Sequence, residues 1–382
     1  MIYVKKIQIC TRCILDETVP DIKFDEQGVC NYCKMYERMN VLYPLNKEGK
    51  QKLNKLITQI KASGKNKRYD CVVGVSGGRD SSFTLLMAKK FKLRPLAVHV
   101  DNGWNTEISV SNIKQVTSRL GVDLYTVVLD WEEFKDLQLA FLKASVPDGE
   151  IPTDIAIFGA LHRVAAQEGV RYIIEGHNFR TEGNCPRDWT YMDGRYIRSI
   201  NKRFGSVKLR DYPNLTLLRL LYYVLIKRIK VIRLLEYLPY SQKEITKIVK
   251  RELGWREYGE KHYESRYTRF FQGYILPRKF GIDKRKVHLS AQIRSGQITR
   301  EAALKRIKKP PISEAQAQED KEYVLKKLGL SEEEFEKILS LPPKSFRDYP
   351  TYYSIIRFFR PAIFLACKAQ ILPMSLYEKY AK

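Results

Sequence analysis

The stretch that decides the fold runs from residue 69 to residue 82 and has the sequence Tyr69-Asp-Cys-Val-Val-Gly-Val-Ser76-Gly77-Gly78-Arg79-Asp80-Ser81-Ser82. An apolar run that ends in a glycine turn and continues into a helical pattern predicts a buried β-strand, a tight loop and a helix start. Unpaired amides and the positive end of the helix dipole would face an anion there, and the glycines let it approach the backbone. The stretch contains neither G-x-x-x-x-G-K-S/T nor G-x-G-x-x-G, which excludes a Walker A loop and a dinucleotide fingerprint. It therefore predicts a phosphate-binding loop that serves another nucleotide chemistry.

Three further apolar runs predict a parallel sheet around this loop. Runs of β-forming residues at 71–75, 96–100, 124–129 and 172–175 alternate with helical patterns, and the spacing leaves room for a crossover helix each time. We expect a doubly wound α/β domain over residues 51–205, with ligands at the carboxyl ends of its strands. The loops at those ends carry His99 and Asp101 after the second strand, and Gly176, His177 and Asn178 after the fourth.

Four of the seven cysteines form two pairs, Cys10-x-x-Cys13 and Cys30-x-x-Cys33, with sixteen residues between the pairs. Two such knuckles have zinc-ribbon spacing, because each pair supplies two thiolates to one tetrahedral Zn²⁺. Disulfide pairing is the competing interpretation. The first residues show no signal-peptide apolar segment, which favours a reducing cytoplasmic compartment and therefore metal. We expect residues 1–50 to form a zinc-knuckle module with a structural metal.

Residues 206–382 have helical patterns with strongly mixed charge, and we expect a helical substrate- or partner-binding region. Two of its segments, 215–235 and 352–368, are apolar but interrupted by Lys and Arg, so neither provides the span of about 18–20 apolar residues that crosses a membrane. Two interpretations stay open: buried helices with solvated ends, or a docking face for a protein partner or an anionic membrane surface.

The chain is strongly basic, since Lys and Arg exceed Asp and Glu by 68 − 43 = 25. The resulting field attracts polyanions, whether nucleotides, sugar nucleotides, RNA or an anionic membrane. Charge alone does not choose among them.

The phosphate loop resembles that of the PP-loop ATP pyrophosphatase superfamily, whose S-G-G-x-D-S signature is matched by Ser76, Gly77, Gly78, Asp80 and Ser81. The resemblance implies that the loop grips the β- and γ-phosphates of ATP while a substrate oxygen attacks the α-phosphorus, with Mg²⁺ as a cofactor. The ATP-binding residues that we infer are Ser76, Gly77, Gly78, Asp80, Ser81, Ser82, His99, Asp101, Gly176, His177 and Asn178.

A second cluster narrows the family. It comprises Lys261-His262-x-Glu264-Ser265 and, further on, Arg278-Lys279-Phe-Gly-x-Asp283-Lys284-Arg285. Together with the cysteine pairs, the S-G-G-x-D-S loop and Glu175-Gly-His-Asn178, it resembles the N-acetyl sugar amidotransferases, which include the WbpG-type lipopolysaccharide enzymes and the PseA-type enzymes.

This resemblance implies that ATP activates the carbonyl oxygen of an N-acetyl group on a nucleotide-linked sugar, and that ammonia then displaces AMP to leave an acetamidino group, in O-antigen biosynthesis. Asp80, Lys279 and Arg285 are the catalytic candidates in its light. Asp154, His262, Glu264 and Ser265 are candidates for substrate contact.

The chain shows no glutaminase motif of its own, and ammonia is mostly protonated at neutral pH. The resemblance therefore implies separate partners, a glutaminase and an ammonia-conducting barrel related to the histidine-biosynthesis pair. We expect no nucleic acid partner, a cytoplasmic location and possible peripheral contact with the inner membrane.

The rival interpretation is a tRNA-modifying PP-loop enzyme of the thiolation or lysidine type. Thiolation requires a reactive cysteine: Cys71 is expected to be inert in a buried strand, whereas Cys185 stays a candidate.

Overall fold

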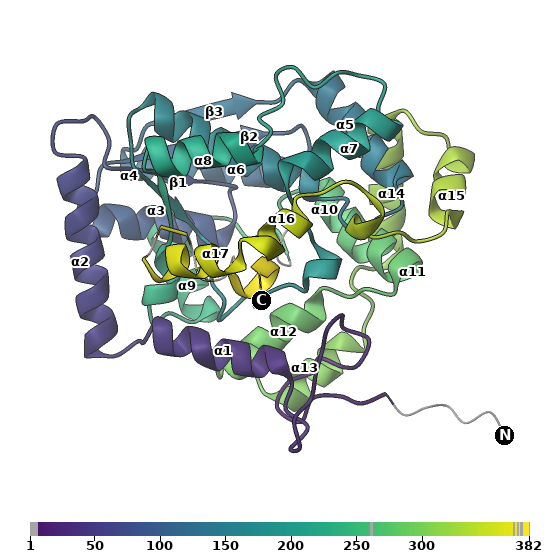
Figure 1. The fold of residues 1–382 in the computed structure, drawn as a ribbon, viewed down its shortest axis with the longest axis horizontal. Helices are drawn as coiled ribbons and strands as arrows, with labels where there is room; N and C mark the ends of the chain where they lie inside the picture. Colours follow the sequence, from purple (N-terminus) through teal and green to yellow (C-terminus); the bar gives the residue numbers. More distant parts are fainter. Residues whose placement is uncertain (1–6, 260–262, 370, 373, 375–376, 382) are drawn as a thin grey trace.

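A computed structural model describes residues 7–259, 263–369, 371–372, 374 and 377–381 (Figure 1). Its centre is a parallel sheet of five strands in the order β3-β2-β1-β4-β5. The strands are β1 (Cys71–Gly74), β2 (Pro95–Asp101), β3 (Leu124–Val128), β4 (Tyr172–Glu175) and β5 (Lys230–Arg233). The strand before the phosphate loop thus lies in the middle of the sheet, where β2 and β4 pair with it on either side.

Helices cover both faces of the sheet because successive residues of a strand point to opposite sides. Val72 of β1 belongs to one hydrophobic cluster with α5 and α6, whereas Cys71 and Val73 belong to another with α2, α3, α4 and α9. The helices of this α/β part are α2 (Lys47–Ser63), α3 (Arg79–Lys90), α4 (Glu107–Leu120), α5 (Trp131–Lys143), α6 (Ile151–Gln167), α7 (Gly194–Phe204) and α9 (Gln242–Leu253). The doubly wound parallel sheet predicted from the sequence is therefore confirmed.

Short helices make up most of the rest of the chain. They are α1 (Asn31–Leu42), α8 (Leu217–Leu221), α10 (Arg266–Phe270), α11 (Leu276–Phe280), α12 (Arg285–Arg294), α13 (Arg300–Ile307), α14 (Glu314–Leu328), α15 (Glu332–Ser340), α16 (Tyr353–Phe358) and α17 (Arg360–Lys368), with the turns η1 (Arg187–Trp189), η2 (Tyr222–Ile226), η3 (Leu234–Tyr237), η4 (Phe271–Ile275), η5 (Phe346–Asp348) and η6 (Tyr377–Ala381). Within the described ranges, no helix is long and apolar enough to cross a membrane.

Segment 215–235 does not form the buried helix that was one of our two interpretations of its sequence. It forms α8 and the π-helical turn η2, reverses at Arg228, whose φ is 55°, and then enters the sheet as β5. No residue of α8 or η2 is buried. Tyr172↔Lys230 and Glu175↔Arg233 pair β5 with β4, so the sheet takes its fifth strand from beyond the boundary that we placed at residue 205.

The helical region also returns to the sheet. The amide of Thr106 donates to the carbonyl of Glu264 at 2.9 Å, and the amide of Arg266 donates to the carbonyl of Trp104 at 3.0 Å. Asn105 and Ser265 form an antiparallel bridge between these bonds. Residues 264–266 therefore lie beside the loop that follows β2, at the carboxyl edge of the sheet.

Candidate active site and metal centre

The backbone of Gly77 is fixed from three directions. Its φ is +76°, and a Cβ there would lie 2.2 Å from the carbonyl oxygen of Ser109 on α4, so only glycine fits. Its carbonyl accepts a hydrogen bond from Trp255 Nε1 at 2.8 Å and another from Asn112 Nδ2 at 3.3 Å. The phosphate loop is thus held rigidly against α4 and the segment after α9.

The helix start behind this loop has the features of an anion site. The N-cap residue of α3 is Gly78, and no side chain caps the first turn. The hydroxyl of Ser81 instead accepts from the amide of Ser76 at 3.2 Å and contacts the hydroxyl of Ser76 at 3.3 Å, which holds the turn closed. Amides left uncapped at a helix N-terminus bind phosphate oxygens well. The residues present therefore fit the phosphates of ATP.

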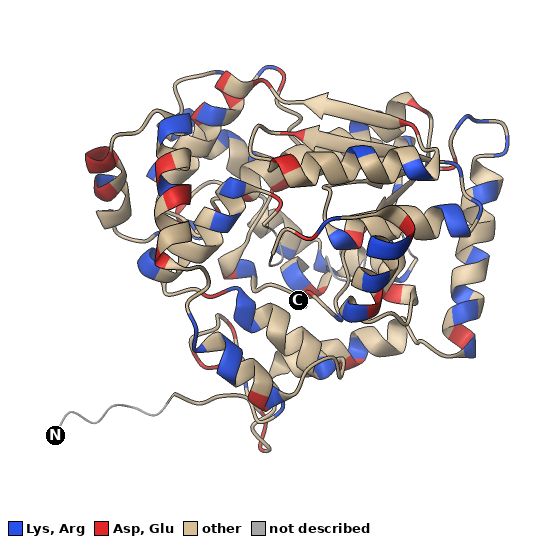
Figure 2. Ribbon diagram, turned by 180° about the vertical axis from the view of Figure 1, so that it is seen from behind, with Lys and Arg blue, Asp and Glu red and all other residues tan. Residues whose placement is uncertain are grey.

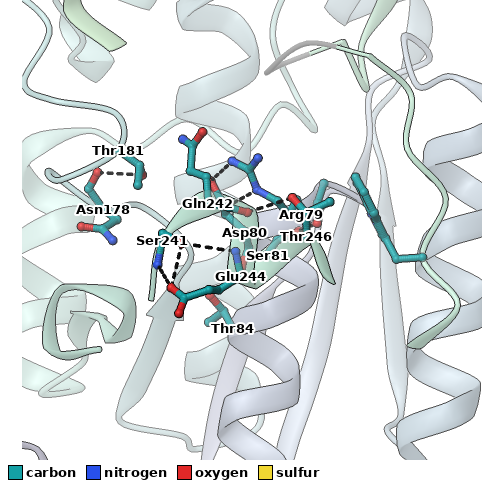
Figure 3. Close-up of polar contacts among 12 residues, drawn as sticks. Arg79, Asp80, Ser81, Thr84, Asn178, Thr181, Ser241, Gln242, Glu244 and Thr246 are labelled. Atoms are coloured by element: carbon teal, nitrogen blue, oxygen red, sulfur yellow. Dashed lines mark hydrogen bonds and ion pairs between the residues drawn. The ribbon is translucent and has the colours of Figure 1, made fainter. Parts of the chain in front are cut away.

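Asp80 lies at this helix start and forms an ion pair with its neighbour Arg79, with Arg79 Nε 2.9 Å from Asp80 Oδ1 (Figure 3). Burial opposes the charge on Arg79, but the Asp80 carboxylate outweighs it and raises the pKa of the guanidinium. Figure 3 shows Gln242 and Thr246 of α9 close to this pair. The helix start thus carries a carboxylate that suits Mg²⁺ and a guanidinium that suits phosphate oxygens.

The loop after β2 orders its own polar groups. His99 Nδ1 lies 3.1 Å from the carbonyl oxygen of Val75, so this nitrogen carries the proton, and Nε2 accepts from Asn105 at 3.2 Å. Burial lowers the pKa of His99, which keeps the ring neutral. Asp101 Oδ1 accepts from the amide of Gly103 at 2.9 Å. Both predicted residues lie at the carboxyl edge, where they shape the turn; their contact with adenosine stays a prediction.

The loop after β4 touches the phosphate loop directly. A Cβ at Gly176 would lie 3.1 Å from the backbone nitrogen of Ser81, so glycine permits this close approach. His177 Nδ1 contacts Glu182 Oε2 at 2.9 Å. Asn178 is buried, and its side chain accepts from the amide of Arg180 at 3.0 Å, which makes it a turn-forming residue. The structure thus brings all three predicted residues to the loop's side of the sheet.

Glu264 and Tyr258 stand over the phosphate loop. The hydroxyl of Tyr258 donates to Glu264 Oε2 at 3.0 Å, and a Cβ at Gly78 would lie 3.0 Å from that hydroxyl and 3.5 Å from Glu264 Oε1. Ser265 caps α10, because its hydroxyl accepts from the amide of Thr268 at 3.3 Å. Of the substrate candidates, Glu264 therefore reaches the loop, and Ser265 lies next to it. His262 lies outside the described residues.

A cavity of about 750 Å³ extends from Arg79 towards the helical region. Its walls come from the end of the phosphate loop, residues 238–244 before and within α9, Glu257, Gly259 and Tyr263, and α12. Among the described residues that line it, six are cationic: Arg79, Arg180, Lys243, Lys284, Arg285 and Arg306. Glu244, Glu257 and Asp283 are the acidic ones. The cavity therefore suits a polar, anionic ligand larger than a phosphate.

The two catalytic candidates of the helical region have different surroundings. Arg285 lines the cavity, where it pairs with Asp283 at 2.6 Å and donates to the carbonyl of Lys309 at 2.8 Å. Lys279 instead donates to the carbonyl of Leu339 at 3.1 Å, at the C-terminus of α15, and burial lowers its pKa to about 8. The structure brings Arg285 to the cavity and gives Lys279 a helix-capping position away from it.

Asp154 lies on α6, one turn after Glu150. Burial and then the charge of Glu150 raise the pKa of Asp154 to about 6. Glu150 itself forms an ion pair with Lys284 and accepts from Gln272 Nε2 at 2.9 Å, and both partners line the cavity. Asp154 thus lies behind the cavity wall, and its role in substrate contact stays a prediction.

Sequence reasoning missed the residues that hold the loop in place. Trp255, Asn112 and Tyr258 contact it from segments far along the chain. Trp255 and Tyr258 belong to a segment before Glu264 that is visibly rich in aromatic residues, but its sequence did not indicate which residues they contact. Arg79 occupies the variable position of S-G-G-x-D-S, which carries no signal of its own.

The four cysteines of the amino-terminal module form a buried cluster, as their spacing predicted. All four sulfurs lie within 4.8 Å of one another, with Cys10–Cys33 at 3.9 Å, Cys13–Cys30 at 3.8 Å and Cys30–Cys33 at 3.7 Å. A Zn–S bond of about 2.3 Å in tetrahedral geometry separates sulfurs by about 3.8 Å. The residues present therefore fit a closed structural zinc site, and the separations exclude disulfides.

This cluster is anchored to the helical region. Arg300 on α13 donates to the carbonyls of Cys13 at 3.0 Å and Cys10 at 3.1 Å, and Lys286 on α12 pairs with Asp16 at 2.5 Å. Because α12 also forms a wall of the cavity, the metal module supports that wall from behind.

Comparisons with known proteins agree with parts of this description. Residues 264–361 match the family described as LPS biosynthesis protein WbpG-like, C-terminal domain. An uncharacterized protein of Methanocaldococcus jannaschii is 25% identical over 317 residues, which cover 79% of this chain and 94% of that protein.

Two solved structures are more distant. NMN synthetase from Francisella tularensis has a TM-score of 0.37 and 14% identity, covering 68% of this chain and 91% of its own. A predicted subunit of tRNA methyltransferase from Methanocaldococcus jannaschii has a TM-score of 0.28 and 14% identity, covering 47% of this chain and 75% of its own. The family match confirms the WbpG-type resemblance of the segment that begins at Glu264.

The cysteine cluster predicts a metal content that elemental analysis measures. We expect about one Zn²⁺ per purified chain. Cys30→Ser should lose the zinc and lower the melting temperature, because metal binding supplies much of the folding free energy of such a module. Cys185 lies outside the cluster, with its sulfur 3.2 Å from the hydroxyl of Thr190, so Cys185→Ser should keep the zinc. Full zinc retention in Cys30→Ser would contradict the assignment.

The conformation of Gly77 predicts that Gly77→Ala abolishes nucleotide binding, measured by titration with a non-hydrolysable ATP analogue. The new methyl group would collide with Ser109 and displace the loop. Gly169→Ala is the matched control, since its φ is +65° but a Cβ there meets nothing within 4 Å. It should cost about 1 kcal/mol of stability and leave binding unchanged. Equal affinity in the two variants would show that the loop does not hold the nucleotide.

Proposed function

Since the chain joins a parallel α/β sheet with a PP-loop to a WbpG-like C-terminal domain, we propose that it is an ATP-dependent amidotransferase acting on a nucleotide-linked N-acetyl sugar. The carbonyl oxygen of the N-acetyl group attacks the α-phosphorus of ATP, and the bond to pyrophosphate breaks. Ammonia then adds to the activated carbon, the carbon–oxygen bond breaks, and AMP leaves with the oxygen. The product carries an acetamidino group and serves surface polysaccharide synthesis.

The observation that carries this proposal is the position of Glu264. It is the first residue of the matched domain, and its carboxylate stands beside Gly78 at the start of α3. The domain that distinguishes this family therefore begins where the phosphates of ATP would lie. An acceptor held by that domain would meet the α-phosphate without any large movement of the chain.

The cavity supports an acceptor of this class. Its volume of about 750 Å³ lies in the range of sites for molecules larger than a single sugar. Arg285, Lys284 and Arg306 suit the diphosphate of a sugar nucleotide, whereas Arg79 marks the end that opens onto the phosphate loop. The reaction requires a cavity that binds the diphosphate of the acceptor at one end and opens onto the phosphates of ATP at the other.

The proposed reaction needs help chiefly at the phosphates. An amide oxygen is a weak nucleophile, and charge accumulates on the departing pyrophosphate as it attacks. The uncapped amides of α3 and the guanidinium of Arg79 are fixed where this charge develops. Mg²⁺, when bound at Asp80, would neutralise part of the same charge.

The proposed reaction also needs ammonia, which we propose a partner supplies. A glutaminase with an ammonia-conducting barrel, related to the histidine-biosynthesis pair, would deliver ammonia close to the activated acceptor. Ammonium chloride should replace these partners in an assay of the isolated chain, at a rate that rises with pH as the free base becomes more abundant.

A pyrophosphate-release assay tests the proposal. Release should require ATP, Mg²⁺ and a UDP- or CMP-linked N-acetyl sugar, and AMP should appear when ammonium chloride is added. Asp80→Asn should lower release by about 100-fold or more, because it removes the carboxylate at the helix start. Its zinc content should match that of the wild type, which separates a chemical defect from misfolding.

Failure of every N-acetyl sugar nucleotide to stimulate release would exclude the proposal. Copurifying tRNA whose binding weakens steeply with salt would favour the tRNA-modifying alternative instead. Thiolation at Cys71 is disfavoured, since burial raises the pKa of that thiol and keeps it protonated.

Glu264→Gln tests the acceptor site separately from the ATP site. The change removes a charge beside the phosphate loop while keeping the shape of the side chain, so it should raise the KM for the sugar nucleotide about tenfold and leave ATP-analogue binding unaltered. Glu252→Gln, which removes a surface carboxylate paired with Lys90, is the matched control. A parallel loss of ATP-analogue affinity in Glu264→Gln would assign the carboxylate to the nucleotide instead.

A further inference from the structure

Apolar side chains project into solvent from two segments that are far apart in the sequence. In residues 217–228, Leu218 is 79% exposed and Ile226 is 70% exposed. In residues 353–368, Phe358 is 78% exposed and Leu365 is 65% exposed. These side chains are ones that a folded protein normally buries, and several of them gathered together mark an interaction surface.

The two segments lie on the same side of the molecule. Figure 1 draws α8, α16 and α17 on the side that faces the viewer, with α16 and α17 in yellow and α8 in teal above them. We call residues 217–228 and 353–368 together the apolar basic face. None of its residues lines the cavity next to the phosphate loop, so the face is separate from the proposed active site.

The face carries only positive charge. No Asp or Glu occurs between Asp211 and Glu236 or between Asp348 and Glu378. Six exposed cations remain there: Arg219, Lys227, Arg228, Arg357, Arg360 and Lys368. Within the described part of the chain, no ion pair engages any of the six.

The opposite side of the molecule differs from this face. Figure 2 shows Lys and Arg interspersed with Asp and Glu there. The helix α2, at the right edge of that view, carries five Lys and one Glu, but none of its Leu and Ile side chains is exposed. Unpaired positive charge next to exposed apolar side chains is therefore a local feature, beyond what the basic composition of the chain explains.

We propose that the apolar basic face binds the surface of an anionic lipid bilayer. Leu, Ile and Phe side chains would enter the boundary between headgroups and acyl chains, while the Arg and Lys side chains beside them contact lipid phosphates. The helices are too short to span a bilayer, so the contact is peripheral. The enzyme would thus act at the membrane surface, whatever the identity of its substrate.

Charge argues against a second copy of the chain as the occupant. A symmetric contact through this face would bring its cations against the same cations, and like charges at an interface cost several kcal/mol. An acidic protein is the remaining alternative. The bilayer is favoured because the apolar side chains project outward from short helices, and a bilayer accepts them without a complementary shape.

Vesicle flotation tests the proposal with the full chain. We expect binding to vesicles of phosphatidylcholine mixed with phosphatidylglycerol, weak binding to phosphatidylcholine alone, and release at high salt. Because each basic residue near an anionic surface raises partitioning about fivefold, Arg357→Glu with Arg360→Glu should lower it by about 25-fold or more. Leu218→Ser with Phe358→Ser should lower it as well, by removing apolar insertion.

Matched variants elsewhere serve as controls. Val41→Ser and Val128→Ser remove side chains that are also strongly exposed, and Lys55→Glu with Lys61→Glu reverses two charges on α2. These should bind vesicles as the wild type does, and all variants should keep the wild-type melting temperature. Equal binding to neutral and anionic vesicles, or equal losses in the face and control variants, would overturn the proposal. The proposal would also be overturned if the face variants kept vesicle binding but changed from dimer to monomer. The same holds if they kept vesicle binding but lost an acidic protein partner.

Discussion

The fixed backbone of Gly77 is the constraint on which the site depends. Its carbonyl is held by Trp255 and Asn112, and its Cα packs against Ser109, so one helix, α4, and a distant aromatic residue determine the path of the phosphate loop. A loop that must present amides to a charged ligand gains from such rigidity, because no conformational entropy is then lost on binding. The cost is that residues near 109 and 255 are constrained as tightly as the loop itself.

This constraint also links the two halves of the chain. Trp255 and Tyr258 lie against the phosphate loop, and residues 264–266 pair with residues 104–106 through backbone hydrogen bonds. The WbpG-like domain begins within this segment, at Glu264. The helical region therefore contributes to the candidate site, and backbone hydrogen bonds hold its first residues beside the sheet.

The sequence predicted what depends on local pattern. Four strands, the glycine turn and the cysteine cluster are encoded by residues near one another, so alternation and spacing were enough to find them. β5 was missed because the segment before it has an apolar pattern interrupted by cations that resembles a helix, and only pairing with β4 makes residues 230–233 a strand. The surroundings of Lys279 were equally hidden, since its acceptors lie about sixty residues further along the chain. The spacing of residues along the sequence does not reveal contacts that form only in the folded chain.

The surplus of 25 positive charges does not identify a partner, because the fold uses its cations in different ways. Lys279 and Arg300 donate to backbone carbonyls, and Lys284 and Arg285 pair with the carboxylates of Glu150 and Asp283. The two carboxylates reduce the long-range field of Lys284 and Arg285, and the backbone carbonyls fix Lys279 and Arg300 in structural positions. A distant polyanion responds mainly to cations that are exposed and unpaired. On the apolar basic face such cations stand among exposed aliphatic and aromatic side chains, which a phosphate backbone does not need and a bilayer surface accommodates. Net charge does not distinguish one polyanion from another, but the position of the unpaired cations among exposed apolar side chains favours a bilayer surface.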